Sequence, residues 1–196
     1  LQIKLFLTRQ ENQSAQRFLT KHHLSSNAIL IGIQPGASQK FKQWPIRHFI
    51  SLIQSLHRHR NFKFVIFGNQ EERPLAELIK KKVKVIISSG ELSLRQSAAL
   101  IKKMDLFITN DTGPMHMALA QKVPLISLFS PTDHHLCWPH LDAPHVEVIA
   151  KPKTCYSCVG HLCHQPYCME QIDPLEVSQR ALQLIETQTD QNIKIS

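Results

Sequence analysis

The chain has 196 residues, a length that suits one domain or two very small ones. Of these residues 42% are hydrophobic and 19% are charged, a balance typical of globular and not of disordered chains. No apolar run approaches the ~18 residues that span a bilayer, and no signal-peptide pattern is present, so we expect a soluble chain. The formal net charge is +8, which favours an anionic partner such as a nucleotide, a phosphorylated substrate, a nucleic acid or an acidic membrane surface.

Strand-like and helix-like segments alternate along the chain. Apolar runs predict strands at 28–34, 62–67, 83–87, 105–109, 123–129 and, at the sheet edge, 145–150. Helical spacing, turn residues and prolines predict helices that begin near 45, 72, 93, 113 and 174. This alternation implies an α/β fold with a parallel sheet covered on both faces. In such sheets ligands bind beyond the carboxyl ends of the strands.

The most informative segment is Asn110-Asp-Thr-Gly-Pro-Met-His116, which follows an apolar strand and opens a helix. Its proline suits a first helical turn. The free N–H groups of Thr112, Gly113 and Met115 would point beyond the strand end, together with the positive end of the helix dipole. Such a turn favours a phosphate or a pyrophosphate. A plain helix start capped by Thr112 or Asp111 is an equally good interpretation.

Three other loops belong to the same rim. Pro35-Gly-Ala-Ser38 is followed by Lys40 and Lys42. Small residues let the backbone approach a ligand, and lysines suit phosphate. An ordinary solvated loop would have the same sequence pattern. Glu71 and Glu72 lie near a helix start, where carboxylates favour the dipole and could also accept hydrogen bonds from a ribose. The loop 130–133 reads as an ordinary turn.

Together these loops resemble glycosyltransferase family 9, the lipopolysaccharide heptosyltransferases. The matching elements are Pro-Gly-Ala-Ser at 35–38, Lys-x-Trp-Pro at 42–45, Asp-Thr-Gly-Pro-Met-His at 111–116, Pro131-Thr132, and Cys155-x2-Cys158-x4-Cys163-x4-Cys168-Met169. The resemblance covers about residues 28–186. The sequence departs from the usual family pattern at Asn69, Gln43 and Ser130, where a glycine, a basic residue and a glycine are common.

The resemblance implies a Rossmann-like, doubly wound parallel sheet that forms the C-terminal, donor-binding domain of a GT-B enzyme. Residues 1–27 would be a linker from an N-terminal domain. Residues 28–196 would be the nucleotide-sugar-binding domain, with a cysteine-rich loop at 151–170 and a closing helix at 174–188. The family's catalytic base, an aspartate near the start of the N-terminal half, has no counterpart here. We therefore expect donor binding without turnover by these residues alone.

The implied reaction transfers a sugar from ADP-heptose to the lipopolysaccharide inner core, without a cofactor, in the cytoplasm or at the periphery of the inner membrane. Lys42 and one of Glu71 or Glu72 would hold the nucleotide sugar, and the Asp-Thr-Gly segment with its histidine would border the diphosphate and sugar. The donor-site residues that we expect are Ser38, Lys42, Glu71, Glu72, Asp111, Thr112, Gly113 and His116.

Four of the five cysteines lie between 155 and 168. Cys155, Cys158, Cys163 and Cys168 have a spacing that could hold tetrahedral zinc. Reduced, packed thiols are the favoured interpretation, since the resemblance implies no metal-dependent chemistry, and disulfides would form only under oxidation. Cys137 stands apart and reads as a small apolar residue.

Two other classes of protein share single features with this chain. Asp-Thr-Gly is also the signature of aspartic proteases, whose two carboxylates share a proton, but that fold is all-β and needs a second motif or a symmetric dimer. A basic nucleotide- or nucleic-acid-binding module without transferase activity would fit the charge of +8. The basic residues are scattered, however, and no aromatic-rich strand motif accompanies them, so we expect no nucleic-acid partner.

Overall fold

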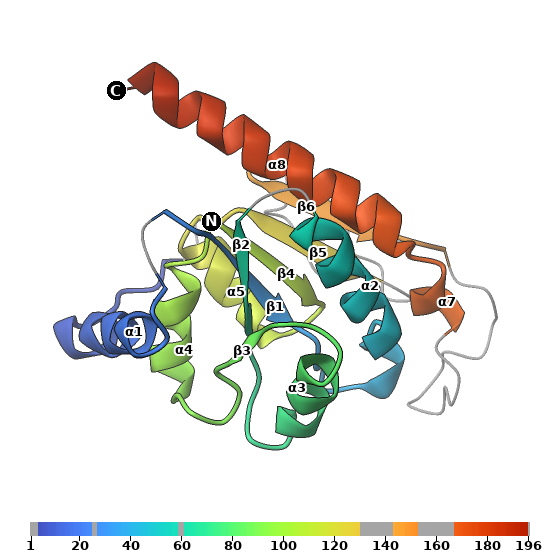
Figure 1. Ribbon diagram of the computed structural model, residues 1–196, viewed down its shortest axis with the longest axis horizontal. Helices are drawn as coiled ribbons and strands as arrows, with labels where there is room; N and C mark the ends of the chain where they lie inside the picture. The colour runs from blue at the N-terminus through green and yellow to red at the C-terminus, as the bar shows by residue number, and fades with distance from the viewer. Residues whose placement is uncertain (1–3, 25–26, 59–60, 130–142, 153–166, 196) are drawn as a thin grey trace.

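A single parallel sheet of six strands forms the centre of the domain (Figure 1). The structure, a computed structural model, describes residues 4–24, 27–58, 61–129, 143–152 and 167–195. The strands lie in the order β3-β2-β1-β4-β5-β6. Their bounds are β1 Ile29–Gln34, β2 Phe62–Ile66, β3 Ile86–Ile87, β4 Leu106–Asn110, β5 Leu125–Phe129 and β6 Val146–Ala150. The predicted α/β class and the parallel sheet are confirmed, and β6 is an edge strand as expected.

Helices cover both faces of the sheet, as a chain of alternating strands and helices requires (Figure 1). One face carries α1 Arg9–Lys21, α4 Leu94–Ile101 and α5 Gly113–Ala120. The other carries α2 Ile46–His57, α3 Arg73–Lys80, the short α7 Tyr167–Glu170 and α8 Pro174–Ile195. A 3₁₀ turn, η1 Lys40–Lys42, lies between β1 and α2. Each face therefore has its own apolar core.

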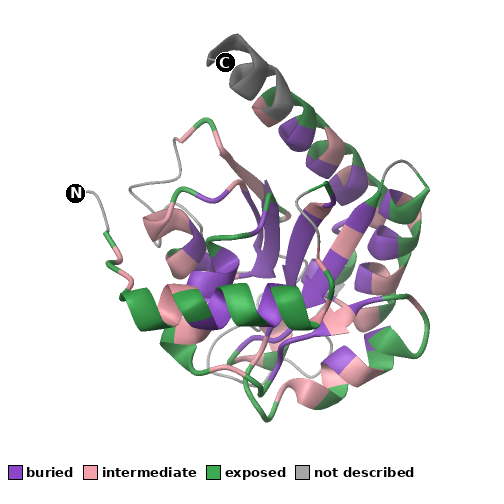
Figure 2. Ribbon diagram, turned by 60° about the vertical axis from the view of Figure 1, so that its left-hand side comes forward, coloured by how far each residue is buried: buried purple, intermediate pink, exposed green. Residues whose placement is uncertain are grey.

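The central strands are buried on both faces (Figure 2). Ile31 and Ile33 belong to the core beneath α2 and α8, while Leu30 belongs to the core beneath α1 and α4. Gly32 must lack a side chain, because a Cβ there would lie 2.6 Å from the Phe107 ring. The aromatic ring thus occupies the space beside the glycine and makes the two strands pack tightly.

Helix α1 lies within the segment predicted as a linker, residues 1–27. Its capping box joins Thr8 and Glu11, and Ala15 and Phe18 are buried. Arg95 of α4 donates a hydrogen bond to the Glu11 carboxylate and another to the Phe6 carbonyl oxygen, the latter at 2.6 Å. The Arg95 guanidinium lowers the pKa of Glu11 to about 2. The segment therefore packs on the domain; its role as a linker stays a prediction.

Some element bounds differ from those predicted. The strand expected at 83–87 contains only Ile86–Ile87, because the N–H groups of Lys82 and Val83 donate back to the Ile79 carbonyl and prolong the last turn of α3. The closing helix, expected at 174–188, extends to Ile195. In the described part of the chain, no helix combines the length and the apolar character that crossing a membrane would require.

Candidate functional site

A pocket of about 420 Å³ opens at the carboxyl ends of β1, β2 and β4, where a parallel sheet is expected to hold its ligand. Its polar lining comes from the end of β1 and from the three loops that follow these strands; these residues are Gln34, Ser38, Asn69, Glu71, Glu72, Thr112 and Gly113. Its apolar lining includes Phe67, Leu92, Leu94, Ile101, Pro114 and Met117. The pocket thus combines hydrogen-bonding groups with apolar side chains.

The N-terminus of α5 contributes Thr112 and Gly113 to the lining of the pocket. Thr112 is the N-cap residue, but its side chain makes no capping hydrogen bond; its Oγ1 lies 3.2 Å from Thr109 Oγ1 instead. The Thr112 side chain therefore does not cap the helix. The N–H groups of Thr112 and Gly113 have no hydrogen-bond acceptor among the described residues, so they are available to an anion.

The prediction for Met115 is wrong. Its N–H donates to the Thr112 carbonyl oxygen at 3.1 Å, because the first turn of α5 tightens into a 3₁₀-type bond. Its side chain is buried. The candidate anion site is consequently made by the amides of Thr112 and Gly113.

Lys42 and Asp111 form an ion pair beside this turn. Lys42 Nζ lies 2.6 Å from Asp111 Oδ2, and the side chains are 21% and 11% exposed. The pair joins the 3₁₀ turn η1 to the loop after β4, which are 69 residues apart in sequence. Burial of this degree strengthens the Coulomb attraction relative to that of a surface salt bridge. The pair places the ammonium group against the residue that precedes Thr112, but neither Lys42 nor Asp111 lines the pocket itself.

A buried asparagine, which sequence reasoning did not assign to the site, holds the rim loops together. Asn110 is fully buried. Its Nδ2 donates to the carbonyl oxygens of Pro35 and Gly36 at 2.9 and 3.2 Å, and its Oδ1 accepts the Trp44 N–H at 3.1 Å. Every hydrogen-bonding group of the amide faces one loop. Asn110 therefore fixes the shape of the segment that contains Lys42.

Glu72 and Glu71 differ in how they are held. Glu72 Oε2 accepts hydrogen bonds from Gln34 Nε2 at 3.1 Å and from the Asn69 N–H at 2.9 Å. Glu71 is exposed and makes no hydrogen bond or ion pair to the described residues. Both line the pocket, but only Glu72 has a fixed carboxylate.

The remaining expected residues have varied positions. Ser38 is exposed and lines the pocket, whereas His116 is exposed on α5 and does not line it. Pro131, Thr132, Cys155, Cys158 and Cys163 lie outside the described residues. Cys168 is buried in α7, and within the described ranges no group of three or more potential ligands could hold a metal ion.

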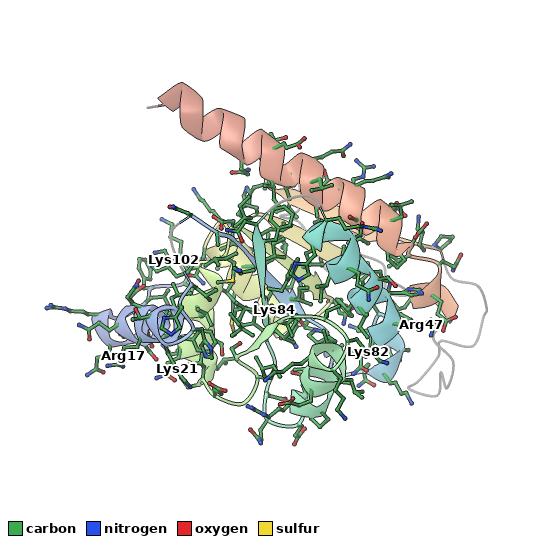
Figure 3. All side chains as sticks on the ribbon, viewed as in Figure 1. Arg17, Lys21, Arg47, Lys82, Lys84 and Lys102 are labelled. Atoms are coloured by element: carbon green, nitrogen blue, oxygen red, sulfur yellow. The ribbon has the colours of Figure 1, made fainter. Side chains whose placement is uncertain are left out.

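The basic side chains are spread over the helices and loops on both sides of the sheet. Figure 3 shows Arg17 and Lys21 on α1, Lys102 after α4, Arg47 on α2, and Lys82 and Lys84 after α3. Several are already paired, such as Lys21 with Glu91 and Arg47 with Glu170. Over the described ranges, this distribution lacks the continuous basic stripe that is typical of nucleic-acid-binding domains.

A family model matches most of the chain. The sequence model of glycosyltransferase family 9 (heptosyltransferase) matches residues 1–168. Over 117 residues the chain is 36% identical to lipopolysaccharide heptosyltransferase 3 of Escherichia coli, an alignment that covers 57% of this chain and 34% of that protein. The chain spans about a third to a half of the length of the curated relatives it matches.

Two solved structures share the fold. The family 9 glycosyltransferase of Veillonella parvula superimposes with a TM-score of 0.79 at 24% identity and covers 94% of this chain and 54% of its own. The ADP-heptose lipopolysaccharide heptosyltransferase II of E. coli gives a TM-score of 0.76 at 23% identity, over 95% of this chain and 54% of its own. With the family model matched from residue 1 to residue 168, this chain belongs to glycosyltransferase family 9, the heptosyltransferases.

Proposed function

We propose that this chain binds the nucleotide-sugar donor of a heptosyltransferase, with ADP-heptose as the donor and the lipopolysaccharide inner core as the acceptor of the whole protein. Support comes from the family match and from a structural relative that is described as an ADP-heptose lipopolysaccharide heptosyltransferase. We further propose that the reaction takes place on the cytoplasmic side of the inner membrane. A net charge of +8 favours such an anionic surface.

The observation that carries this proposal is the mixed polar and apolar lining of the pocket at the carboxyl edge of the sheet. A nucleoside diphosphate has a flat base with apolar faces, a ribose with hydroxyl donors, and an anionic diphosphate. The side chains of Phe67, Leu92 and Met117 suit the base, and the free amides of Thr112 and Gly113 suit a phosphate. The base and the diphosphate therefore each have a chemically matching part of the pocket.

Glycosyl transfer requires stabilisation of the leaving diphosphate, whose negative charge grows as the bond to the sugar breaks. Amides at a helix N-terminus and a nearby ammonium group, here those of Thr112, Gly113 and Lys42, would supply this without reorganisation. A base must also remove the proton of the acceptor hydroxyl. We propose that the base and the acceptor site belong to the part of the relatives that this chain does not span.

Replacing Lys42 by alanine should weaken ADP binding by about ten- to a hundred-fold, because a charge-assisted hydrogen bond contributes roughly 1.5–3 kcal/mol. The substitution also removes the cation that pairs with Asp111. The negative charge of the Asp111 carboxylate would then be less well neutralised and would repel the phosphates. Calorimetric titration with ADP measures the effect.

Lys40 is the matched control, since it lies in the same 3₁₀ turn but is exposed and makes no ion pair within the described residues. Lys40→Ala should change ADP affinity by less than about threefold, in keeping with the small worth of an exposed charge. Equal losses in both variants that vanish in high salt would mean general attraction of anions, and the proposed donor site would be wrong.

A further inference from the structure

Glu72 is held by a reciprocal pair of hydrogen bonds with Asn69. Its Oε2 accepts the Asn69 N–H at 2.9 Å, while its own N–H donates to Asn69 Oδ1 at 2.9 Å. These two hydrogen bonds close the loop between β2 and the start of α3. It fixes both the backbone and the carboxylate of Glu72 with respect to the rim of the pocket.

The loop after β1 holds the same carboxylate from the other side. A Cβ built on Gly36 would lie 1.8 Å from Glu72 Oε1, so the carboxylate packs directly against the backbone there. A Cβ on Gly68, whose φ is +150°, would lie 3.1 Å from both Cβ and Oε2 of Glu72. The two glycines leave room for the carboxylate, and any side chain at position 36 would displace it.

Gln34 makes the third contact with the Glu72 carboxylate, and one of its own polar atoms stays without a hydrogen bond. Its side chain is 2% exposed, and its Nε2 donates to Glu72 Oε2 at 3.1 Å. Its Oε1 is buried without a partner in the described structure. Turning the amide over would place an oxygen against the carboxylate, so the charge of Glu72 dictates the orientation. Buried, unsatisfied polar atoms are rare and call for a reason; here the reason is the anchored carboxylate.

We propose that Gln34 is a positioning residue that, with Asn69, fixes the Glu72 carboxylate to accept the hydroxyls of the donor's ribose. Oε2 already accepts two hydrogen bonds, whereas Oε1 accepts none from the described residues, and Glu72 lines the pocket. A carboxylate only accepts hydrogen bonds, and the ribose diol is the donor pair that a nucleoside diphosphate offers. Glu71, which has no such anchors, is not assigned this role. The inference rests on the proposed function.

The test compares ADP with 2′,3′-dideoxy-ADP, which lacks both hydroxyls, by calorimetry on the chain and on Gln34→Met. Methionine keeps the length of the side chain and removes the donor. The chain should prefer ADP by about tenfold or more, the usual effect of losing a charge-assisted hydrogen bond. Gln34→Met should lose most of the ADP affinity that depends on the hydroxyls, about five- to tenfold, and bind dideoxy-ADP within about twofold of the parent.

Gln121→Met is the matched control. Gln121 also has a buried Oε1 without a partner among the described residues, and its Nε2 donates to the Ala98 carbonyl at 2.7 Å, but it does not line the pocket. This variant should keep the preference for ADP. Thermal unfolding of each variant checks that it is folded.

The outcomes separate the inference from the proposed function. If Gln34→Met weakens both ligands equally, or neither, Gln34 does not position a ribose contact and the inference is wrong. If the parent binds both ligands equally, Glu72 does not hold the ribose, although the nucleotide site stands. If the parent binds no ADP, the proposed function and the inference are both wrong.

Discussion

Replacing Gly113 by valine should abolish nucleotide binding and leave the domain folded. Gly113 is exposed at the first position of α5, and a Cβ built there meets nothing within 4 Å. Its φ is not in the left-handed region, so a side chain is sterically allowed there, at a modest backbone cost because the residue precedes Pro114. The added methyl groups would stand in the pocket wall beside the free amides of Thr112 and Gly113 and keep a phosphate from reaching them.

Loss of two hydrogen bonds to a charged group corresponds to a fall in ADP affinity of about a hundredfold or more. Calorimetry measures the affinity, and thermal unfolding measures the stability, which should stay within about 1 kcal/mol of the parent. Gly113→Ala, with one carbon added, should give a smaller loss. A folded valine variant that binds ADP like the parent would show that the turn only starts a helix.

Replacing Asn110 by alanine should cause the largest loss of stability among single changes at this rim. The substitution removes three hydrogen bonds of a fully buried amide and leaves the Trp44 N–H and the carbonyl oxygens of Pro35 and Gly36 without that partner. A buried polar group left unsatisfied costs about 1–3 kcal/mol. We expect the free energy of unfolding to fall by about 3 kcal/mol, and Tm by about 6–12 °C.

The same change should weaken ADP binding, since the loop that carries Lys42 is held by Asn110. Asn12→Ala is the matched control: Asn12 is on α1, and its Nδ2 makes an exposed hydrogen bond to the Thr8 carbonyl at 2.8 Å. That control should change the free energy of unfolding by no more than about 0.5 kcal/mol. An Asn110→Ala protein that unfolds at the temperature of the parent would contradict the anchoring role.

Hydrophobic pattern predicted the architecture because buried parallel strands are continuous apolar runs. Helix α1 was not predicted as a helix, since only two of its four buried residues, Phe18 and Leu19, are large and apolar, whereas Ser14 and Ala15 are small. The capping box Thr8–Glu11, with Arg-Gln between, was the available signal. The strand predicted at 83–87 was too long because Val85 is buried, and Val83 partly buried, although neither is a strand residue. Burial alone does not distinguish a strand from a packed loop.

The sequence also predicted that the loops after β1, β2 and β4 converge, because the carboxyl ends of parallel strands share an edge. The fourth loop expected there, 130–133, lies outside the described residues. It could not predict the partners across that edge. Gln34 meets Glu72, 38 residues away, and Asn110 meets Pro35, 75 residues away. Each is a polar residue at the carboxyl end of an apolar strand. That position indicates a candidate site residue but does not indicate which residue it will contact. The Met115 amide was assigned wrongly, since the geometry of a first helical turn depends on bonds that sequence does not specify.

Amide NMR of the labelled chain during titration with ADP tests the central claim most directly, because it reports where the ligand binds. We expect saturable shifts that are largest at Thr112 and Gly113, with further shifts at Ser38 and Gly68 on the same rim. Lys81 and Lys82, at the far end of α3, should barely shift. Shifts centred on those lysines, or shifts that grow without saturation and disappear in high salt, would contradict a nucleotide site at the carboxyl edge of the sheet.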